Sequence, residues 1–216
     1  MSDNRMDNNR VNVTGKICSG FRYSHQIYGE GFYVADICIS RESGYTDIIP
    51  LMFSDKLLDA GQDYTGSMVA VVGQFRSYNR HEERKNRLVL SIFVQEVEFL
   101  EEEPVNSREN NRIFLEGFVC KEPVYRKTPL GREIADILLA VNRPYGKSDY
   151  IPCIAWGRNA RFAGRLEVGE AVKLHGRIQS REYVKCLSEE KVETMVAYEV
   201  SASQLEQASG TGGDET

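Results

Sequence analysis

The chain has 216 residues, of which 41% are hydrophobic and 27% charged, so it can form one large or two small globular domains. No apolar run approaches the roughly 18 residues of a membrane helix, and the N-terminus lacks the apolar centre of a signal peptide. We therefore expect a cytoplasmic protein. The net charge of −5 argues against a nucleic-acid partner until it is divided along the chain.

The positive charge is concentrated in one part of the chain. Residues 111–186 carry 14 Lys and Arg against 8 Asp and Glu, a net charge of +6, whereas residues 9–100 carry 10 against 11. The acidic excess lies mainly in residues 101–110 and after residue 186. Because phosphate responds to the local field, the overall acidity does not exclude a nucleic-acid partner.

Five runs in the first half show the alternation of apolar and polar residues that is typical of β-strands. They begin at Arg10, with Val11, Val13 and Gly15 alternating, and continue with residues 32–40, 46–54, 68–78 and 88–100. A short helix is predicted over residues 55–60, between the third and fourth strands. This order is that of an OB-fold, a five-stranded β-barrel. We predict residues 1–8 to be disordered and residues 9–100 to form one OB-fold.

The second half repeats the first. Five landmarks recur at offsets of 100 to 103 residues, which pair residues 9–11 with 111–113, Gly15 and Cys18 with Gly117 and Cys120, 35–37 with 135–137, 49–50 with 151–152, and Gly73 with Gly176. Nearly constant spacing indicates a tandem duplication. The prediction is an all-β protein with a linker at residues 101–110, a second OB-fold at residues 111–203 with its own short helix, and a flexible tail at residues 204–216.

The sequence offers little for catalysis or metal binding. Its five cysteines and three histidines are scattered and form no C-x-x-C pair. We expect reduced cysteines that serve as small core residues, with no metal and no cofactor. Nucleotide-binding, nucleophile-elbow and zinc-protease motifs are absent from the sequence. The protein is not expected to be an enzyme.

Four elements of the second half occur in a characteristic order. Leu115-Glu116-Gly117 is followed by Glu-Pro-x-x-Arg at residues 122–126, by Cys-Ile-Ala-Trp-Gly-Arg at residues 153–158, and by a Gly-x-Ile-x-x-Arg-x-Tyr run at residues 176–183. In order and spacing, residues 111–183 resemble the bacterial single-stranded DNA-binding protein family. For residues 9–100 the resemblance is weaker and depends on the internal repeat.

The resemblance implies sequence-tolerant binding of single-stranded DNA, with bases stacked on aromatic rings and cations along the backbone. The stacking positions fall at Tyr145, Tyr150, Trp156 and Tyr183. The basic residues expected around them are Arg126, Lys127, Arg143, Lys147, Arg158, Lys173, Arg177 and Arg181. Strand alternation places Tyr150 and Trp156 on one face of their strand. The alternatives are a core position for Trp156 and ordinary solvated positions for the tyrosines and cations.

The first half has a charged stretch, residues 76–87, between its last two strands. OB-folds use this loop to embrace oligonucleotides. The candidate binding residues here are Phe53, Arg76, Tyr78, Arg80, Arg84 and Lys85. The alternative is a solvated hairpin of alternating charges.

The sequence also departs from the family pattern. Three usual tryptophans are tyrosines here, Pro152 replaces a basic residue, and residues 212–216 lack the apolar tip that recruits replication and repair enzymes. The predicted function is binding and protection of single-stranded DNA in replication, recombination and repair, by a nucleoid-associated homodimer with four OB-folds. A protein-interaction or primosome-type accessory module, and RNA binding, are the alternatives.

Overall fold

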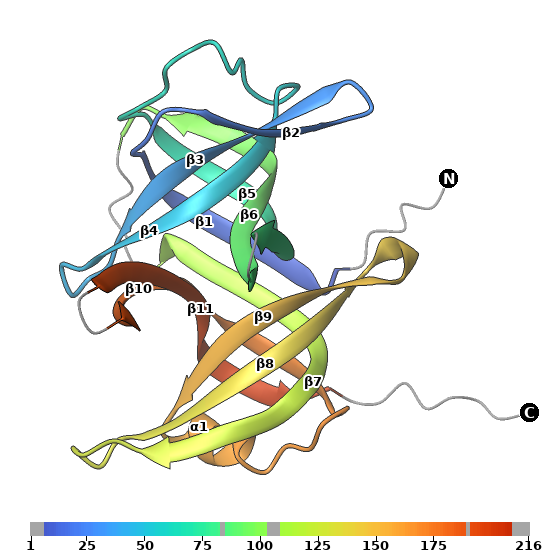
Figure 1. Cartoon of the computed structure of the whole chain (residues 1–216), viewed down its shortest axis with the longest axis vertical. Coiled ribbons are helices and arrows are strands. Elements are labelled where there is room, and N and C mark those ends of the chain that lie inside the picture. Colours follow the sequence, from blue (N-terminus) through green and yellow to red (C-terminus); the bar gives the residue numbers. More distant parts are fainter. Residues whose placement is uncertain (1–6, 83–84, 103–108, 189–190, 209–216) are drawn as a thin grey trace, which may run out of the picture. The chain divides into compact units, whose positions relative to one another are not determined.

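The computed structural model describes residues 7–82, 85–102, 109–188 and 191–208, with side chains described outside residues 79–87 and 185–192. The described residues are mostly β-structure, and the chain divides into two compact units (Figure 1). The first unit comprises Arg10–Arg112 and Ile178–Glu199. The second unit comprises Met1–Asn9, Ile113–Arg177 and Val200–Thr216.

The second half of the chain supplies five strands and a short helix. These are β7 (Asn111–Lys127), β8 (Glu133–Arg143), β9 (Lys147–Trp156), α1 (Arg158–Ala163), β10 (Ala171–Ser188) and β11 (Lys191–Gln207). Strands β7, β8 and β9 pair antiparallel, β9 pairs with β11 in parallel, β11 neighbours β10, and β10 returns to β7. Helix α1 follows β9 and packs against β8 and β9.

The first half repeats this pairing with one added strand. Its elements are β1 (Asn9–Ile17), β2 (Arg22–Ile27), β3 (Glu30–Ser40), β4 (Thr46–Ser54), β5 (Met68–Glu82) and β6 (Lys85–Leu100). Strand β1 pairs with β5, β5 with β6, β6 with β4 in parallel, β4 with β3, and β3 with β1. The added strand, β2, pairs antiparallel with β3.

Alternating apolar residues form the core of each unit. Val11, Ile37 and Ile49 are fully buried in the first unit, and Leu115 and Ile151 are fully buried in the second. Each such residue follows and precedes a more exposed one, as the period of two in a strand requires. The apolar alternation predicted from the sequence therefore corresponds to the buried faces of the strands.

The repeated glycines mark places where two strands approach closely. A Cβ atom at Gly73 would overlap the carbonyl oxygen of Phe93, and one at Gly176 would overlap that of Ser201. Gly15 and Gly117, the other repeated pair, face the backbone of the neighbouring strand in the same way. Only glycine fits such a contact without a shift of the backbone.

The predicted helix over residues 55–60 is wrong, because this segment forms turns. Asp55 accepts the Gly31 amide at 3.0 Å and Asp59 accepts the Gly61 amide at 2.9 Å. Ser54 also accepts the backbone amide of Lys56 through its hydroxyl. These side-chain bonds satisfy backbone groups locally and compete with helix formation.

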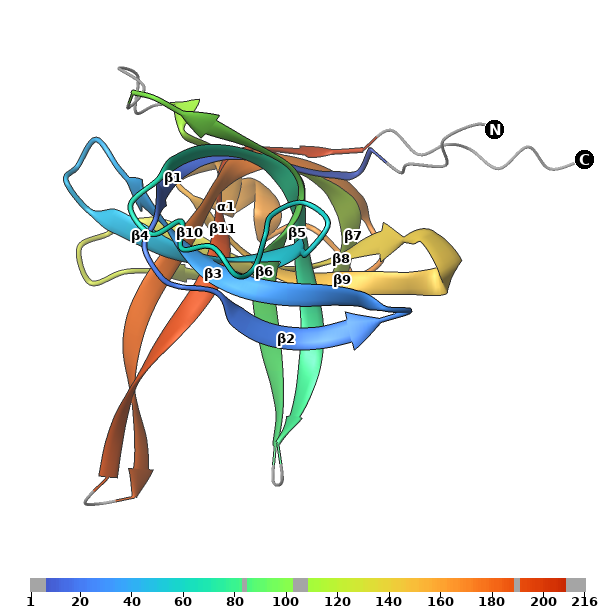
Figure 2. The ribbon, with the colours of Figure 1, turned by 90° about the horizontal axis from the view of Figure 1, so that it is seen from above.

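Strand β2 was missed in the sequence because most of its residues are exposed, so its sequence shows no apolar alternation. The charged stretch predicted as a loop is largely strand, since the backbones of β5 and β6 pair as far as Glu82 and Lys85. Figure 2 shows this pair as a long two-stranded hairpin.

The expectation that all five cysteines are reduced is also wrong. Cys18 and Cys38 form a disulfide, with their Cα atoms 5.9 Å apart. They are 20 residues apart in sequence, and the pairing of β1 with β3 brings them together, because Lys16 lies opposite Cys38. Cys120 and Cys153 carry thiols, and burial raises the pKa of the Cys120 thiol.

Candidate nucleic-acid interface

Two predicted stacking residues lie on the same exposed side of β9. Tyr150 is 45% exposed and Trp156 is 41% exposed, whereas Ile151, Cys153 and Ala155 on the opposite side are buried. Ile154, which lies between the two rings on their own side, is also buried. Alternation along the strand directs the two rings outward and the small and branched side chains inward. A core position for Trp156 is therefore not what the structure shows.

The strand register extends this exposed side over β7 and β8. The rows across the three strands are Phe118–Ala140–Tyr150, Lys121–Leu138–Pro152 and Arg126–Ile134–Trp156. Residues that pair directly across strands point to the same side of a sheet. We call this side of β7, β8 and β9, which carries all nine of these residues, the outer face.

At one end of the outer face, the β8–β9 hairpin projects an aromatic ring into solvent. Tyr145 is 99% exposed, and its backbone has a positive φ of 65°, which residues other than glycine rarely adopt. Residues 142–148 surround a pocket of about 470 Å³ at this tip. Arg143 Nε lies 3.3 Å from Oδ2 of the buried Asp149, and this ion pair anchors the base of the hairpin. The hairpin thus brings the candidate residues Arg143, Tyr145 and Lys147 together.

At the other end, charged residues lie on the elements next to Trp156. Arg126, opposite Ile134 in the row that ends at Trp156, forms an ion pair with Asp136. Lys127 follows Arg126 at the end of β7, and Arg158 begins α1, two residues after Trp156. Both side chains are exposed. The Tyr125 hydroxyl donates to Glu133 Oε1 at 2.7 Å, and this hydrogen bond raises the pKa of Tyr125.

Strand β10 contributes two more of the predicted cations to the second unit. Lys173 lies 3.9 Å from Glu116, and Arg177 is exposed. Between them, the ring of His175 lies 4.9 Å from the ring of Phe114. These side chains alternate with the buried Val172 and Leu174, so they point outward.

Arg181 and Tyr183 lie on the part of the β10–β11 hairpin that belongs to the first unit. The backbone amide of Ser180 donates to Asp47 Oδ1 at 2.8 Å, and the Ile48 amide donates to the Ser180 hydroxyl at 3.1 Å. The Arg181 guanidinium lies 5.9 Å from the Tyr183 ring centre. The predicted cluster is therefore divided, with Arg181 and Tyr183 in one unit and the other second-half residues in the other.

The first-half candidates whose side chains the structure describes, Phe53, Arg76 and Tyr78, form no comparable surface. Phe53 is only 2% exposed and packs against Phe21, with the ring centres 4.3 Å apart, so its prediction as a stacking residue is wrong. Tyr78 is 41% exposed. The Arg76 guanidinium lies 3.9 Å over the Phe93 ring and donates to Gln74. Arg80, Arg84 and Lys85 lie outside the described side chains.

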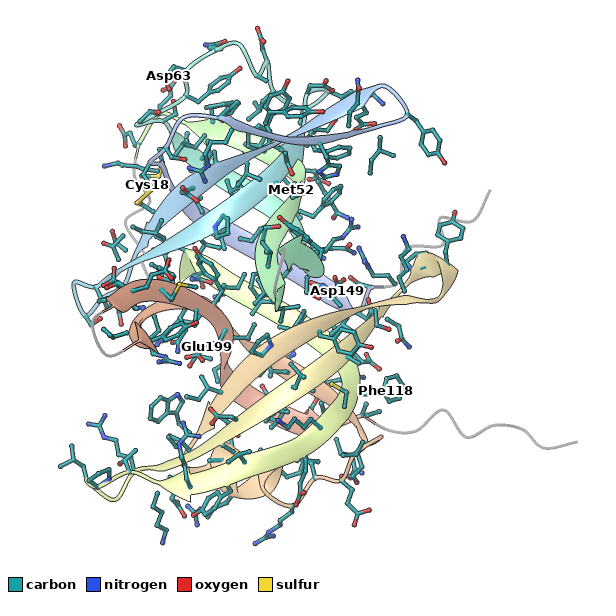
Figure 3. All side chains as sticks on the ribbon, in the orientation of Figure 1. Cys18, Met52, Asp63, Phe118, Asp149 and Glu199 are labelled. Carbon is teal, nitrogen blue, oxygen red and sulfur yellow. A yellow bond between two sulfur atoms is a disulfide. The ribbon has the colours of Figure 1, made fainter. Side chains whose placement is uncertain are left out.

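One exposed aromatic residue on the outer face was missed. Phe118, which Figure 3 labels on the second half of the chain, is 44% exposed. The strand register places it in a row with Tyr150. The alternation of Phe114, Glu116 and Phe118 with Ile113 and Leu115 predicts its orientation. No motif in the sequence distinguishes it from a partly buried strand residue.

Within the described ranges, no three His, Cys, Asp or Glu side chains are grouped so as to hold a metal ion. Over the same residues, no helix has the length and apolar character needed to cross a membrane.

The chain is similar to known proteins both in sequence and in structure. The sequence model of the Single-strand binding protein family matches residues 110–206. A single-stranded DNA-binding protein of Halalkalibacterium halodurans is 38% identical over 80 residues, which cover 34% of this chain and 48% of that protein. Single-stranded DNA-binding protein A of Bacillus subtilis is 38% identical over 80 residues, covering 34% and 46%. The chain thus spans about half the length of the curated relatives it matches.

The similarity in structure extends over nearly the whole chain. The crystal structure of the wild-type single-stranded DNA binding protein from Thermus aquaticus superposes with a TM-score of 0.74, covering 96% of each chain at 16% sequence identity. At this identity the likeness concerns the fold. It includes the first half, which lies outside the residues that the family model matches.

Proposed function

Because the chain belongs, through residues 110–206, to the bacterial single-strand binding protein family, we propose that it binds single-stranded DNA without strong sequence preference. Its role would be to keep strands unpaired and protected during replication, recombination and repair. The outer face supports this proposal most directly, since Tyr150 and Trp156 present exposed rings from one strand. Chemical catalysis is not part of the proposed role.

Stacking and phosphate contacts together account for sequence tolerance. Every base has a π-face, and an aromatic platform contributes about 1–3 kcal/mol per base. Tyr145, Tyr150 and Trp156 would provide the platforms. The local net charge of residues 111–186, from 14 Lys and Arg against 8 Asp and Glu, would attract the backbone.

The pairing of strands supports a finer proposal for the architecture. In each half, five strands pair in a series that returns to its first member, β1 in one half and β7 in the other. We assign these series to two OB-folds in tandem. A homodimer would then present four OB-folds. Sedimentation velocity at micromolar concentration should give twice the mass of one chain, and a concentration-independent monomer would rule the dimer out.

The test of the function is fluorescence anisotropy of a labelled oligo-dT of 35 nucleotides, titrated with the full chain. The double variant Tyr145→Ala/Tyr150→Ala should bind at least tenfold more weakly, because two stacks are lost. The matched control, Tyr145→Phe/Tyr150→Phe, keeps both rings and should bind as the wild type does. Absence of binding by the wild type would refute the function, and tighter binding of oligo-rU at equal ionic strength would favour RNA.

A further inference from the structure

Phe118 stands in a row of small residues on the outer face. Its partners across the two adjacent strands are Ala140 on β8 and Ala171 on β10. The next residue beyond Ala140 is Tyr150 on β9. Two half-exposed rings thus stand on either side of a single methyl group, with exposed fractions of 44% for Phe118 and 45% for Tyr150.

From this row we propose that Phe118 and Tyr150 form a slot that holds one nucleobase between their rings, with Ala140 as its floor. The slot deepens the proposed function, on which it rests, by naming a further stacking residue. It is specific to the second half. At the offset of 102 residues, the first half has Lys16 and Ile48 in place of Phe118 and Tyr150.

The dimensions of the sheet suit one base. Neighbouring strands lie about 4.8 Å apart, so the backbones that carry the two rings are about 9.6 Å apart. Stacked bases follow one another at about 3.4 Å, so a base between two rings requires about 6.8 Å from ring to ring. The remaining width allows the rings to tilt onto the base.

Neighbouring residues keep the slot open and supply a cation. Ala140 and Ala171 each add only a methyl group beside Phe118, so no large side chain on β8 or β10 covers its ring in this row. Lys121, the next residue of β7 to pair on the outer face, is exposed. Its ammonium group would approach the phosphate of a base held in the slot.

The test measures the affinity of the full chain for labelled oligo-dT in Phe118→Ala, Tyr150→Ala and the double variant. Each single variant should weaken binding by about tenfold. Because the two rings would hold the same base, the double variant should weaken binding by clearly less than the product of the two single effects. Phe118→Leu should show the same loss without a large loss of apolar volume, and it replaces Phe118→Ala if that variant does not fold.

Filling the slot provides a second test that leaves both rings in place. Ala140→Leu should weaken oligo-dT binding by about tenfold, because the larger side chain would occupy the space of the base. The slot is refuted if Ala140→Leu or Phe118→Leu binds normally, or if the effects of Phe118→Ala and Tyr150→Ala multiply. If Phe118→Leu binds normally while Tyr150→Ala binds weakly, the slot is refuted but the proposed function stands. If the wild type does not bind oligo-dT, both the slot and the proposed function are refuted.

Discussion

Arg41 and Asp47 in the first half occupy the same positions as Arg143 and Asp149 in the second, 102 residues further along the chain. Both carboxylates are fully buried, and each lies in an ion pair with its arginine. In the first unit, Asp47 accepts Arg41 Nε at 2.6 Å and also the amide of Ser180. A buried charge pair therefore lies at equivalent positions of the two halves.

The exposed positions differ between the halves. At the same offset, Tyr145, Tyr150 and Trp156 correspond to Ser43, Ile48 and Ser54. Ser54 is 7% exposed, whereas Trp156 is 41% exposed. The buried charge pairs are alike in the two halves, while the exposed residues that would contact a strand differ. A common fold therefore does not imply a common binding surface.

The largest expected effect tests the shared buried pair. Asp47→Ala leaves Arg41 without its buried partner and should lower the free energy of unfolding by about 3 kcal/mol. Asp149→Ala should have an effect of similar size, since its carboxylate is as deeply buried. Urea unfolding followed by circular dichroism measures both. A loss below about 1 kcal/mol in either variant would show that the two pairs do not have equivalent roles.

A smaller loss of stability is expected at the repeated glycines. In Gly73→Ala and Gly176→Ala, the new methyl group would meet backbone of the adjacent strand, so the strands must separate slightly. Overpacking of this kind costs about 2 kcal/mol. Gly20→Ala is the control, because no atom lies within 4 Å of its added Cβ. Equal thermal stability of all three variants would contradict the close approach.

The exposed positions allow a matched comparison of binding. Tyr150 and Ile48 correspond between the halves and are 45% and 48% exposed. Tyr150→Ala should weaken oligo-dT binding by about tenfold, since one stack is lost. Ile48→Ala should leave the affinity within about twofold of the wild type, because an aliphatic side chain offers no aromatic platform. Anisotropy titrations at one ionic strength measure both affinities. Equal losses of affinity in the two variants would show that the two halves contribute equally to binding.

The smallest expected effect concerns single cations. Lys147→Gln should reduce the slope of log K against log salt by about 0.7, because one phosphate contact is lost. Lys56 in the first half already pairs with Glu30 at 2.6 Å, so Lys56→Gln should not change this slope. The result to look for is the difference between the two slopes over the same salt range.

The predictable parts of the fold were those with clear alternation. The apolar runs around Val11, Ile37 and Ile151 mark buried strand faces, and the repeated glycines mark close contacts between strands. Strand β2 and the paired backbone near Glu82 escaped prediction because their polar sequences show no such period. Residues 55–60 lacked a helix because nearby side chains bond to the backbone instead.

The candidate site was predictable where one strand or hairpin contains it. Tyr145, Lys147, Tyr150 and Trp156 follow each other within one hairpin, and the structure places them along its length. Tyr183 was grouped with them because sequence order does not show which unit a long hairpin joins. Phe118 was missed because its place beside Tyr150 depends on the register of three strands.

The fluorescence of Trp156, the single tryptophan of the chain, most directly tests whether the second half carries the strand-binding surface. Titration of the full chain with oligo-dT should quench this fluorescence to saturation, and added salt should weaken the quenching by weakening the phosphate contacts. Unchanged tryptophan emission, under conditions where anisotropy shows the oligonucleotide to be bound, would place the strand elsewhere and contradict the account.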